Sequence, residues 1–279
     1  MGLFVAELDY LNPSGSKRDH IAFGIIEEAE RLGTLKPGQP IVELTSVRTG
    51  TGLSLVRAIK GYRFIAVICE GNSVERARMM AATGAEVVLV DQMPSSVPGQ
   101  ISGPNPQLIE IEPEAFLADQ FTHDGNWLAH YDGTGTELWE QTDGNLDGFV
   151  DYVGSGGGTC AGVTKRLKAL NSPGKCFIVE PHGAARPIQG AGYVMPDLIY
   201  LYNVPVDGCI QVTGDQAREG AKLLARKEGI FGGFSSGANL SAAIKLPKGP
   251  VQEKTFAIND CDSGLKCLST DLWAEISKK

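Results

Sequence analysis

Three side chains with cationic forms lie close together in the segment LNPSGSKRDHIAFGIIEEAERLG, residues 11–33, between a Gly/Pro turn and an apolar run with helical spacing. They are Lys17, Arg18 and His20. A lysine amine can form a Schiff base once it has lost its proton, whereas arginine stays protonated at any working pH and holds oxyanions. The chemistry of this segment therefore depends on which of these side chains faces a ligand.

A glycine turn supplies a second candidate for chemistry. The stretch SGGGTCAG presents Gly156, Gly157, Gly158 and Thr159, followed by a helix expected to start near Cys160. Glycines let backbone N–H groups approach an anion, and the helix amino end adds positive potential. The turn predicts an oxyanion site, with an ordinary strand-to-helix turn as the alternative.

Two further turns present hydroxyl groups and amides before an expected helix. ELTSVRTGTGLSL offers Thr45, Ser46, Arg48 and Thr49, which suit a carboxylate or sulfonate group. GGFSSGANL offers Ser235 in a similar place. The alternative for both turns is plain helix capping.

Two single residues are candidates for nucleophilic or acid–base work. Cys160 falls in the first turn of a helix, where the helix dipole would favour the thiolate, so it is a candidate nucleophile or sulfur carrier. His123 could serve as an acid or base near neutral pH. A buried inert thiol and a polar surface histidine are the respective alternatives.

The elements that must position these residues follow an alternating plan. Short β-rich runs (PIVELTS, RFIAVICEG, AEVVLVDQ) alternate with amphipathic runs (GLSLVRAIKGY, SVERARMMAATGA). The segments NLDGFVDYVGSGGGTCAGVTKRLKAL, KCFIVEP and GIFGGFSSGANLSAAIKL repeat the order strand, glycine turn, helix. Such alternation predicts an α/β fold with parallel sheets, whose ligands bind at the carboxyl ends of the strands.

Composition narrows the function classes. The chain has 279 residues, 35 of them glycine, and its net charge of -8 argues against non-specific nucleic-acid binding. It has neither an apolar run long enough to span a membrane nor a signal-peptide-like start, so we expect no membrane partner and a cytoplasmic location. The six cysteines show no zinc spacing, so reduced thiols and no metal site are expected.

The ordered motifs resemble the cysteine synthase and cystathionine β-synthase family, which are fold type II, tryptophan synthase β-like enzymes that use pyridoxal phosphate. The similarity runs from about Leu8 to Thr270. TSVRTG is similar to the family's substrate-carboxylate loop (usually TSGNTG), SGGGTCAG to its phosphate loop (GTGGTxTG) and GLKCLST to its closing GERYLST. Ser235 matches the serine that faces the pyridine nitrogen, and Gln120 matches a glutamine at the domain junction. The resemblance implies two domains, each a mostly parallel sheet flanked by helices, with the ligand between them.

Two departures from the family pattern bear on the cofactor. The family writes its lysine segment NPxxSxKDR, and Arg18 stands in the lysine slot, with Lys17 one residue early. Lys17 is turned by about 100° around a helix from that slot, so we expect it to point elsewhere. The asparagine of TSGNTG is replaced by Arg48. Two arginines thus enter the expected cofactor cavity, which predicts no pyridoxal phosphate, with pyridoxal phosphate on Lys17 as the alternative.

The resemblance implies a smaller domain over residues 12–122 and a larger one over residues 1–11 and 123–279, in a homodimer. The preferred hypothesis is a divergent relative that performs carbon–sulfur chemistry on a small sulfonate, carboxylate or phosphate with a sulfur donor. Coenzyme M synthase-type thiol formation is one such reaction. In it Arg18, Cys160 and His123 act in catalysis; Lys17, Arg48, Thr45, Ser46, Thr49 and Gln120 bind substrate; Gly156–Thr159 and Ser235 bind an anion. The alternatives are a conventional pyridoxal-phosphate cysteine synthase using Lys17 and an inactive relative that binds a metabolite or partner.

Overall fold

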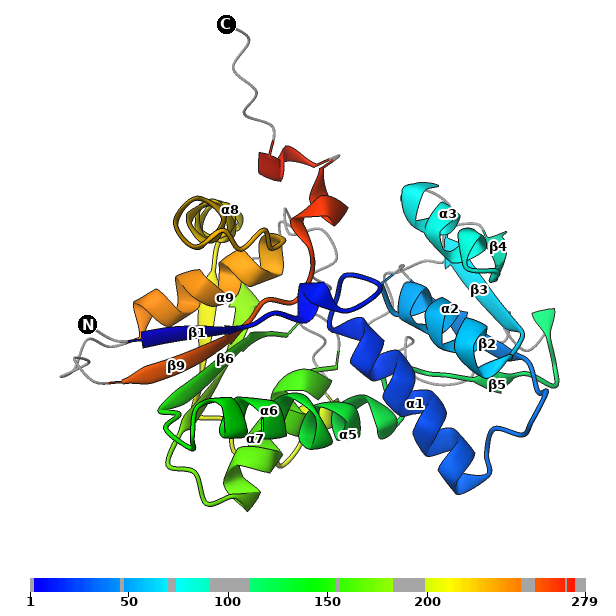
Figure 1. Ribbon diagram of the computed structural model, residues 1–279, viewed down its shortest axis with the longest axis horizontal. Coiled ribbons are helices and arrows are strands. Elements are labelled where there is room, and N and C mark those ends of the chain that lie inside the picture. Colours follow the sequence, from blue (N-terminus) through cyan, green and yellow to red (C-terminus); the bar gives the residue numbers. More distant parts are fainter. Residues whose placement is uncertain are drawn as a thin grey trace, which may run out of the picture.

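A computed structural model of the protein describes residues 3–45, 48–69, 74–90, 111–153, 156–182, 199–246, 254–268 and 270–273. Its strands form two parallel sheets (Figure 1). In order across the larger sheet lie β1 (Leu3–Glu7), β9 (Thr255–Asn259), β6 (Gly148–Tyr152), β7 (Lys175–Pro181) and β8 (Gly208–Val212). In order across the smaller sheet lie β4 (Glu86–Val90), β3 (Phe64–Cys69), β2 (Ile41–Leu44) and β5 (Phe116–Leu117).

Helices cover the sheets. They are α1 (Arg18–Leu32), α2 (Arg48–Lys60), α3 (Val74–Ala82), α5 (Gly125–Asp132), α6 (Thr134–Gln141), α7 (Gly158–Ala169), α8 (Gly214–Leu223) and α9 (Phe234–Lys245). Figure 1 shows α8 and α9 on one face of the larger sheet and α5, α6 and α7 on the other. The predicted α/β architecture with parallel, helix-flanked sheets is therefore confirmed. None of the helices in the described ranges is long and apolar enough to cross a membrane.

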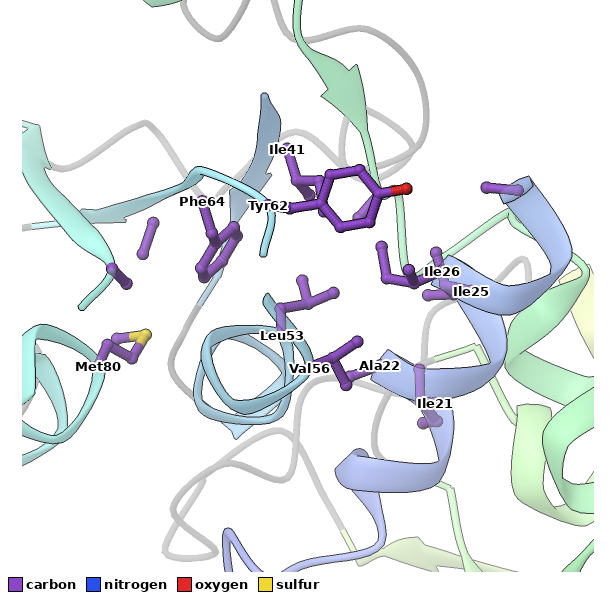
Figure 2. Packing of buried hydrophobic residues seen from close by; sticks show 14 of the residues in the cluster. Ile21, Ala22, Ile25, Ile26, Ile41, Leu53, Val56, Tyr62, Phe64 and Met80 are labelled. Carbon is purple, nitrogen blue, oxygen red and sulfur yellow. The ribbon is translucent and has the colours of Figure 1, made fainter. Parts of the chain in front are cut away.

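Helix α1 connects the cores to the site. Its residues Ile21, Ile25, Ile26 and Ala29 are at most 2% exposed and face the smaller sheet and α2 (Figure 2), as their helical spacing predicts. Leu32 was expected on the same face but is 56% exposed, because the helix ends there at Gly33, which takes the left-handed conformation. The packed stripe fixes the amino end of α1 against α2.

The carboxyl ends of three strands point towards the same region. Asp151 lies near the end of β6, paired in register with Ile178 of β7. Thr45 follows β2, and the segment Asp260–Asp262 follows β9. Parallel strands bring such residues to one edge, where the chain leaves the sheet and side chains become available.

Some local expectations were wrong. The helix expected from Gly52 begins at Arg48, so Arg48 opens the helix instead of lying in a loop before it. The segment before α9 forms an isolated bridge at Gly232 and no strand. β8, α8 and β9 had no predicted counterpart. The surface loop predicted over residues 93–107 lies outside the described residues, and the proposed domain boundaries stay a prediction.

Candidate functional site

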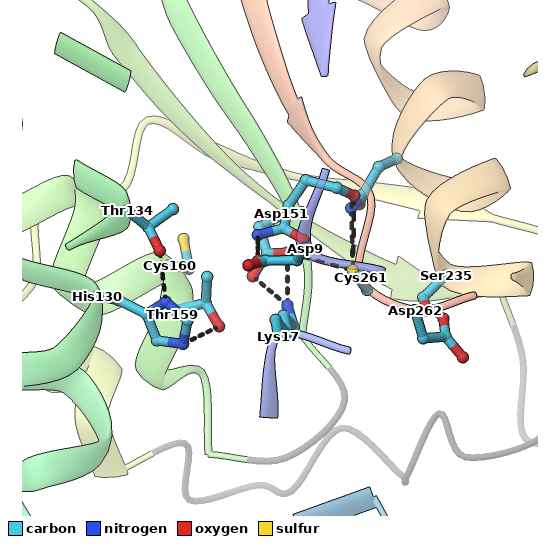
Figure 3. Close-up of polar contacts among 12 residues, drawn as sticks. Asp9, Lys17, His130, Thr134, Asp151, Thr159, Cys160, Ser235, Cys261 and Asp262 are labelled. Atoms are coloured by element: carbon cyan, nitrogen blue, oxygen red, sulfur yellow. Dashed lines mark hydrogen bonds and ion pairs between the residues drawn. The ribbon is translucent and has the colours of Figure 1, made fainter. Parts of the chain in front are cut away.

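Lys17 is buried just before α1 and binds a carboxylate of the larger sheet. Its Nζ lies 2.7 Å from Oδ1 and 3.0 Å from Oδ2 of Asp151 (Figure 3). Burial alone would lower the pKa of Lys17, but the Asp151 charge outweighs it and raises that pKa. Lys17 is therefore held as an ammonium ion in a bidentate contact with Asp151.

Arg18 and Arg48 converge at the amino ends of α1 and α2. Arg48 Nη2 lies 2.9 Å from Oδ2 of Asp262, and Arg18 Nη1 donates to Oε1 of Gln120 at 3.4 Å. Burial and then the positive charge of Arg48 lower the pKa of Arg18 to about 10. Burial would also lower the pKa of Arg48, yet Asp262 raises it. Both guanidinium groups are thus charged at neutral pH, and we call this pair the arginine end of the site.

Gln120 links the arginine end to its surroundings. Its Oε1 accepts from Thr49 Oγ1, and its Nε2 donates to Oε1 of Glu43 at 3.0 Å. Its main-chain oxygen accepts from Asn126 Nδ2 at 2.6 Å and from the Tyr200 hydroxyl at 3.1 Å. Glu43 is buried, which raises its pKa to about 8 and leaves it neutral at pH 7. The amide of Gln120 is consequently fixed from several sides.

The loop before α2 is organised by Thr45. Its Oγ1 accepts from the backbone N–H of Gly50 at 3.1 Å, and its side chain is almost fully buried. This contact ties the end of β2 to the first turn of α2. Thr49 lies inside α2, so it cannot be the N-cap considered for this turn. Ser46, predicted to bind substrate, lies outside the described residues.

The glycine turn forms a second potential anion site, which we call the glycine end (Gly156–Thr159). Gly156 and Gly157 have φ of +69° and +77°, and a Cβ on Gly157 would come within 2.7 Å of Leu201. Both positions therefore need glycine for backbone conformation and for space. Helix α7 begins at Gly158, so its amino end and the N–H of Thr159 belong to the turn.

His130 supports the glycine end and was not singled out by sequence. Its Nε2 lies 3.2 Å from Thr159 Oγ1, and its Nδ1 lies 2.9 Å from Thr134 Oγ1. It is wholly buried, and this burial lowers its pKa well below the usual value, so the ring is neutral. If Nδ1 accepts from Thr134, then Nε2–H donates to Thr159, and the hydroxyl hydrogen of Thr159 can be given to an anion. The His130–Thr134 spacing of four residues gave no distinctive sequence signal.

Ser235 joins the site through Asp262. The hydroxyl of Ser235, in the first turn of α9, donates to Oδ1 of Asp262 at 3.0 Å. Asp262 therefore contacts Ser235 through one oxygen and Arg48 through the other. Sequence reasoning missed Asp262 and Asp151, because carboxylates are common and neither stands in a motif that marked it as functional; Asp151 lies in the quoted strand segment NLDGFVDYVGSGGGTCAGVTKRLKAL without being singled out.

The two residues proposed for nucleophilic and acid–base work, Cys160 and His123, contact other residues than Arg18 and Arg48. Cys160 is wholly buried and touches Thr164, and burial raises its pKa well above that of a free thiol. Burial therefore favours the buried inert thiol considered as the alternative over a thiolate. His123 accepts from the N–H of Gly125 and packs edge-on against Phe116, while burial lowers its pKa. Neither contact brings His123 to Arg18 or Arg48.

Two other side chains near the site take structural positions. His20 Nε2 binds Oδ1 of the buried Asp9 at 2.9 Å, and this bond keeps the pKa of His20 raised although burial would lower it. Cys261 has its Sγ 3.7 Å from Oδ1 of Asp151 (Figure 3). Burial raises the pKa of Cys261 to about 12, so it rests as a neutral thiol.

The arrangement brings four helix amino ends to one region. Arg18 opens α1, Arg48 opens α2, Gly158 opens α7 and Phe234 opens α9. The links are the Arg18–Gln120 and Arg48–Asp262 contacts. Gln120 also accepts from Asn126, whose amide oxygen packs against Gly158. Since each amino end carries partial positive charge, this region suits an anion more than a cation.

The chain is similar to known enzymes along most of its length. The family model described as "Pyridoxal-phosphate dependent enzyme" matches residues 2–262. Cystathionine beta-synthase of Apis mellifera is 36% identical over 91% of this chain, and cysteine synthase 3 of Caenorhabditis elegans is 35% identical over 97%. The chain spans 53% of the first relative and 82% of the second, so it covers about half the length of the cystathionine beta-synthase.

Solved structures give the same result. The cysteine synthase of Entamoeba histolytica superposes with a TM-score of 0.87 and 36% identity, covering 99% of this chain and 83% of that one. O-ureido-L-serine synthase superposes with a TM-score of 0.85 and 32% identity, covering 99% and 89%. With sequence, motif order and fold in agreement, the chain belongs to the family of pyridoxal-phosphate dependent enzymes of the cysteine synthase and cystathionine β-synthase type.

Proposed function

We propose that this chain makes or breaks a carbon–sulfur bond in a small anionic substrate held at the arginine end, without a Schiff base to pyridoxal phosphate. The observation that carries the proposal is the convergence of Arg18 and Arg48 at two helix amino ends, with Arg18 in the slot that resembles the family's lysine position. Guanidinium groups bind sulfonate, carboxylate and phosphate oxygens through paired N–H donors.

Sulfur chemistry is supported by the names of the relatives. They include cysteine synthase, cystathionine beta-synthase and a hydrogen sulfide-producing enzyme from Fusobacterium nucleatum. The last superposes with a TM-score of 0.83 and 32% identity. An activity of this class is therefore the natural starting point for the chain.

Pyridoxal phosphate, the family's cofactor, would have to be held by side chains at this site. A covalently held pyridoxal phosphate needs a lysine amine that can lose its proton. Arg18 cannot supply one, and the Lys17 amine is bound to both oxygens of Asp151 with a raised pKa. The Ser235 hydroxyl already donates to Asp262, which also holds Arg48. These residues do not fit a covalently held pyridoxal phosphate.

In the proposed site, each group has a role in holding charge. Arg18 and Arg48 bind the anionic group, while Gln120 and Thr49 keep the arginine end in place. The backbone amides of the glycine end and the Thr159 hydroxyl bind a second oxyanion or orient the substrate. Thiol formation on a small sulfonate, as in coenzyme M synthesis, is a concrete reaction of this kind. A homodimer remains part of the proposal.

The second candidate is a conventional pyridoxal-phosphate cysteine synthase. It is favoured by the family match over residues 2–262 and by the presence of Lys17 next to the expected position. For this function Lys17 would have to leave Asp151 and turn around the start of α1. The third candidate, an inactive binding protein, would retain the fold and lack turnover.

The first experiment is to incubate the purified chain with pyridoxal phosphate, reduce it with borohydride and map adducts by mass spectrometry. We expect no adduct on Lys17. The Arg18→Lys variant is the matched control, because it restores the family's lysine slot and should yield an adduct at position 18. An adduct on Lys17 of the unaltered chain would overturn the proposal in favour of the conventional enzyme.

A second experiment addresses the reaction. The chain is incubated with sulfide and with small sulfonates and carboxylates that carry an O-acetyl or O-phosphoryl leaving group, so that sulfide replaces acetate or phosphate at carbon, and new thiols are detected by mass spectrometry. We expect thiol formation that disappears in Arg48→Ala. If no member of the panel turns over although anions bind, the inactive binding protein becomes the better description.

A further inference from the structure

The ring of His130 lies between two hydroxyl groups and joins them in one chain of hydrogen bonds. Figure 3 shows Nδ1 of His130 beside Thr134 Oγ1, at 2.9 Å, and Nε2 beside Thr159 Oγ1, at 3.2 Å. His130 and Thr134 are at most 1% exposed, and Thr159 is 4% exposed. Within the described part of the chain, the three side chains make no other hydrogen bond, so the direction of these two contacts decides where each hydrogen lies.

Only one neutral form of His130 gives the buried Thr134 hydroxyl an acceptor. A proton on Nδ1 would be donated to Thr134 Oγ1, and the hydrogen of that hydroxyl would then have no acceptor among the described residues, at the cost of desolvating a polar group. With the proton on Nε2, Thr134 donates to Nδ1 and Nε2–H donates to Thr159. Burial keeps the pKa of His130 well below its usual value, so the ring is neutral.

Thr159 therefore accepts from His130 and keeps its own hydroxyl hydrogen for a ligand. It lies in the first turn of α7, where the backbone N–H groups have no partner within the helix and also point outwards. The amide oxygen of Asn126 packs against Gly158 and is shielded from solvent, so a ligand at the turn does not reach it. A ligand O–H group placed opposite Thr159 would set one hydrogen against another.

From this directed chain we propose that His130, oriented by Thr134, fixes Thr159 as a donor and thereby selects oxyanions whose oxygens carry no proton. Sulfonates and fully ionised phosphate groups meet this condition, whereas a phosphonate or phosphate that retains a P–OH group does not. The inference rests on the proposed function, because it takes the glycine end as an oxyanion site. It deepens that function by naming the protonation state of the bound group and by assigning His130 as the positioning residue that determines it.

One test compares two ligands of equal charge and similar shape that differ by a proton. At pH 6 ethanesulfonate and ethylphosphonate both carry one negative charge, and only the phosphonate has an O–H group. By isothermal titration calorimetry we expect the sulfonate to bind about threefold or more tightly. In His130→Gln the amide can turn either its oxygen or its nitrogen to Thr159, so the affinity ratio should fall about twofold or more. The ratio should stay unchanged in His182→Gln, the same substitution at an exposed histidine that contacts Gln211.

A second test observes the ring directly and needs no ligand. Nitrogen NMR of the chain labelled with nitrogen-15 histidine distinguishes a ring nitrogen that carries a proton from one that does not. We expect the proton of His130 on Nε2 and none on Nδ1. A proton on Nδ1 alone overturns the inference even where anions bind.

The outcomes separate this inference from the proposed function. Equal affinity for both ligands, or an unchanged ratio in His130→Gln, overturns the selection and leaves anion binding intact. If neither ligand binds while the proton lies on Nε2, the anion site fails and the inference fails with it. Should His130→Gln fail to fold, Thr159→Val removes the donor itself, and a ratio that stays unchanged in that variant contradicts the selection.

Discussion

The arginine end and the glycine end both present helix amino ends to an anion, yet they are built from opposite materials. At the arginine end, charged side chains of α1 and α2 face buried carboxylates. At the glycine end, backbone amides and one hydroxyl are supported by a neutral histidine. Side-chain charge acts at longer range and needs compensation when buried, whereas amides depend on backbone geometry. The two ends should therefore fail in different ways when altered.

The largest effect is expected from breaking the ion pair at the arginine end. Arg48→Ala removes the partner of the buried Asp262 and leaves an uncompensated charge, so the free energy of unfolding should fall by about 3–5 kcal/mol. Arg63→Ala is the control, because its ion pairs are solvent-exposed and screened, so their loss should cost far less. Urea unfolding followed by circular dichroism measures both. Equal losses would mean that the Arg48–Asp262 pair is solvated.

The buried carboxyl group of Glu43, which contacts Gln120, should make the stability of the chain depend on pH. The folded pKa of Glu43 is about 8 against 4.5 in a free carboxyl group, so the folded state holds the proton longer. The stability contributed by protonated Glu43 is fully present below about pH 4.5 and is lost as the pH rises through 8. Glu43→Gln cannot titrate, so relative to the unaltered chain it should gain stability over this range, on the order of a few kcal/mol. A constant difference between the two chains across the range would contradict the buried, neutral Glu43.

Backbone geometry is tested by two glycines with similar φ. Gly157→Ala and Gly229→Ala both force a left-handed residue, at φ of +77° and +70°, which costs about 1–2 kcal/mol. At Gly157 the new methyl would also meet Leu201 at 2.7 Å, while at Gly229 nothing lies within 4 Å. Gly157→Ala should lower the free energy of unfolding by about 1–3 kcal/mol more than Gly229→Ala. Identical losses would show that Leu201 moves aside and accommodates the added methyl group.

The smallest effect should come from the hydroxyl of the glycine end. Thr159→Val removes one neutral donor, so the affinity for ethyl phosphate should fall by about 0.5–1.5 kcal/mol, or up to roughly tenfold. Arg18→Gln removes a charged donor and should cost more, about 1.5–3 kcal/mol. Isothermal titration calorimetry of both variants compares how much each end contributes to the affinity for ethyl phosphate. A larger loss in Thr159→Val would make the glycine end the principal anion site.

Much of the fold could be read from sequence because hydrophobic periodicity and glycine turns are local signals. The stripe of Ile21, Ile25 and Ala29 predicts α1, and the run PIVELTS predicts β2. β9 was missed because it is only five residues long, although the Pro/Gly cluster LPKGP precedes it. Leu32 does not join the buried stripe because α1 ends there, and packing decides where the helix ends.

The site was only partly predictable for a different reason. Motif order placed Arg18, Arg48, Thr49 and Gln120 near one another, and the contacts among them agree with that placement. The carboxylates Asp151 and Asp262 lie more than 100 residues along the chain from the cations they bind, so no local pattern could pair them. Burial likewise decides the protonation of Cys160, and sequence spacing does not report it.

The pairing of the first strand, β1, with the last strand, β9, has a consequence for how the chain folds. β1 pairs in parallel with β9, in register from Leu3 with Thr255 to Glu7 with Asn259, and β9 also separates β1 from β6. The larger sheet therefore joins segments from opposite ends of the chain, whereas the smaller sheet uses only residues 41–117. During synthesis the smaller sheet can assemble first, while the larger one must wait for β9, with the slow search that long-range pairing entails. Asp262, which follows β9, can reach Arg48 only once residue 262 has been made, so the site assembles late.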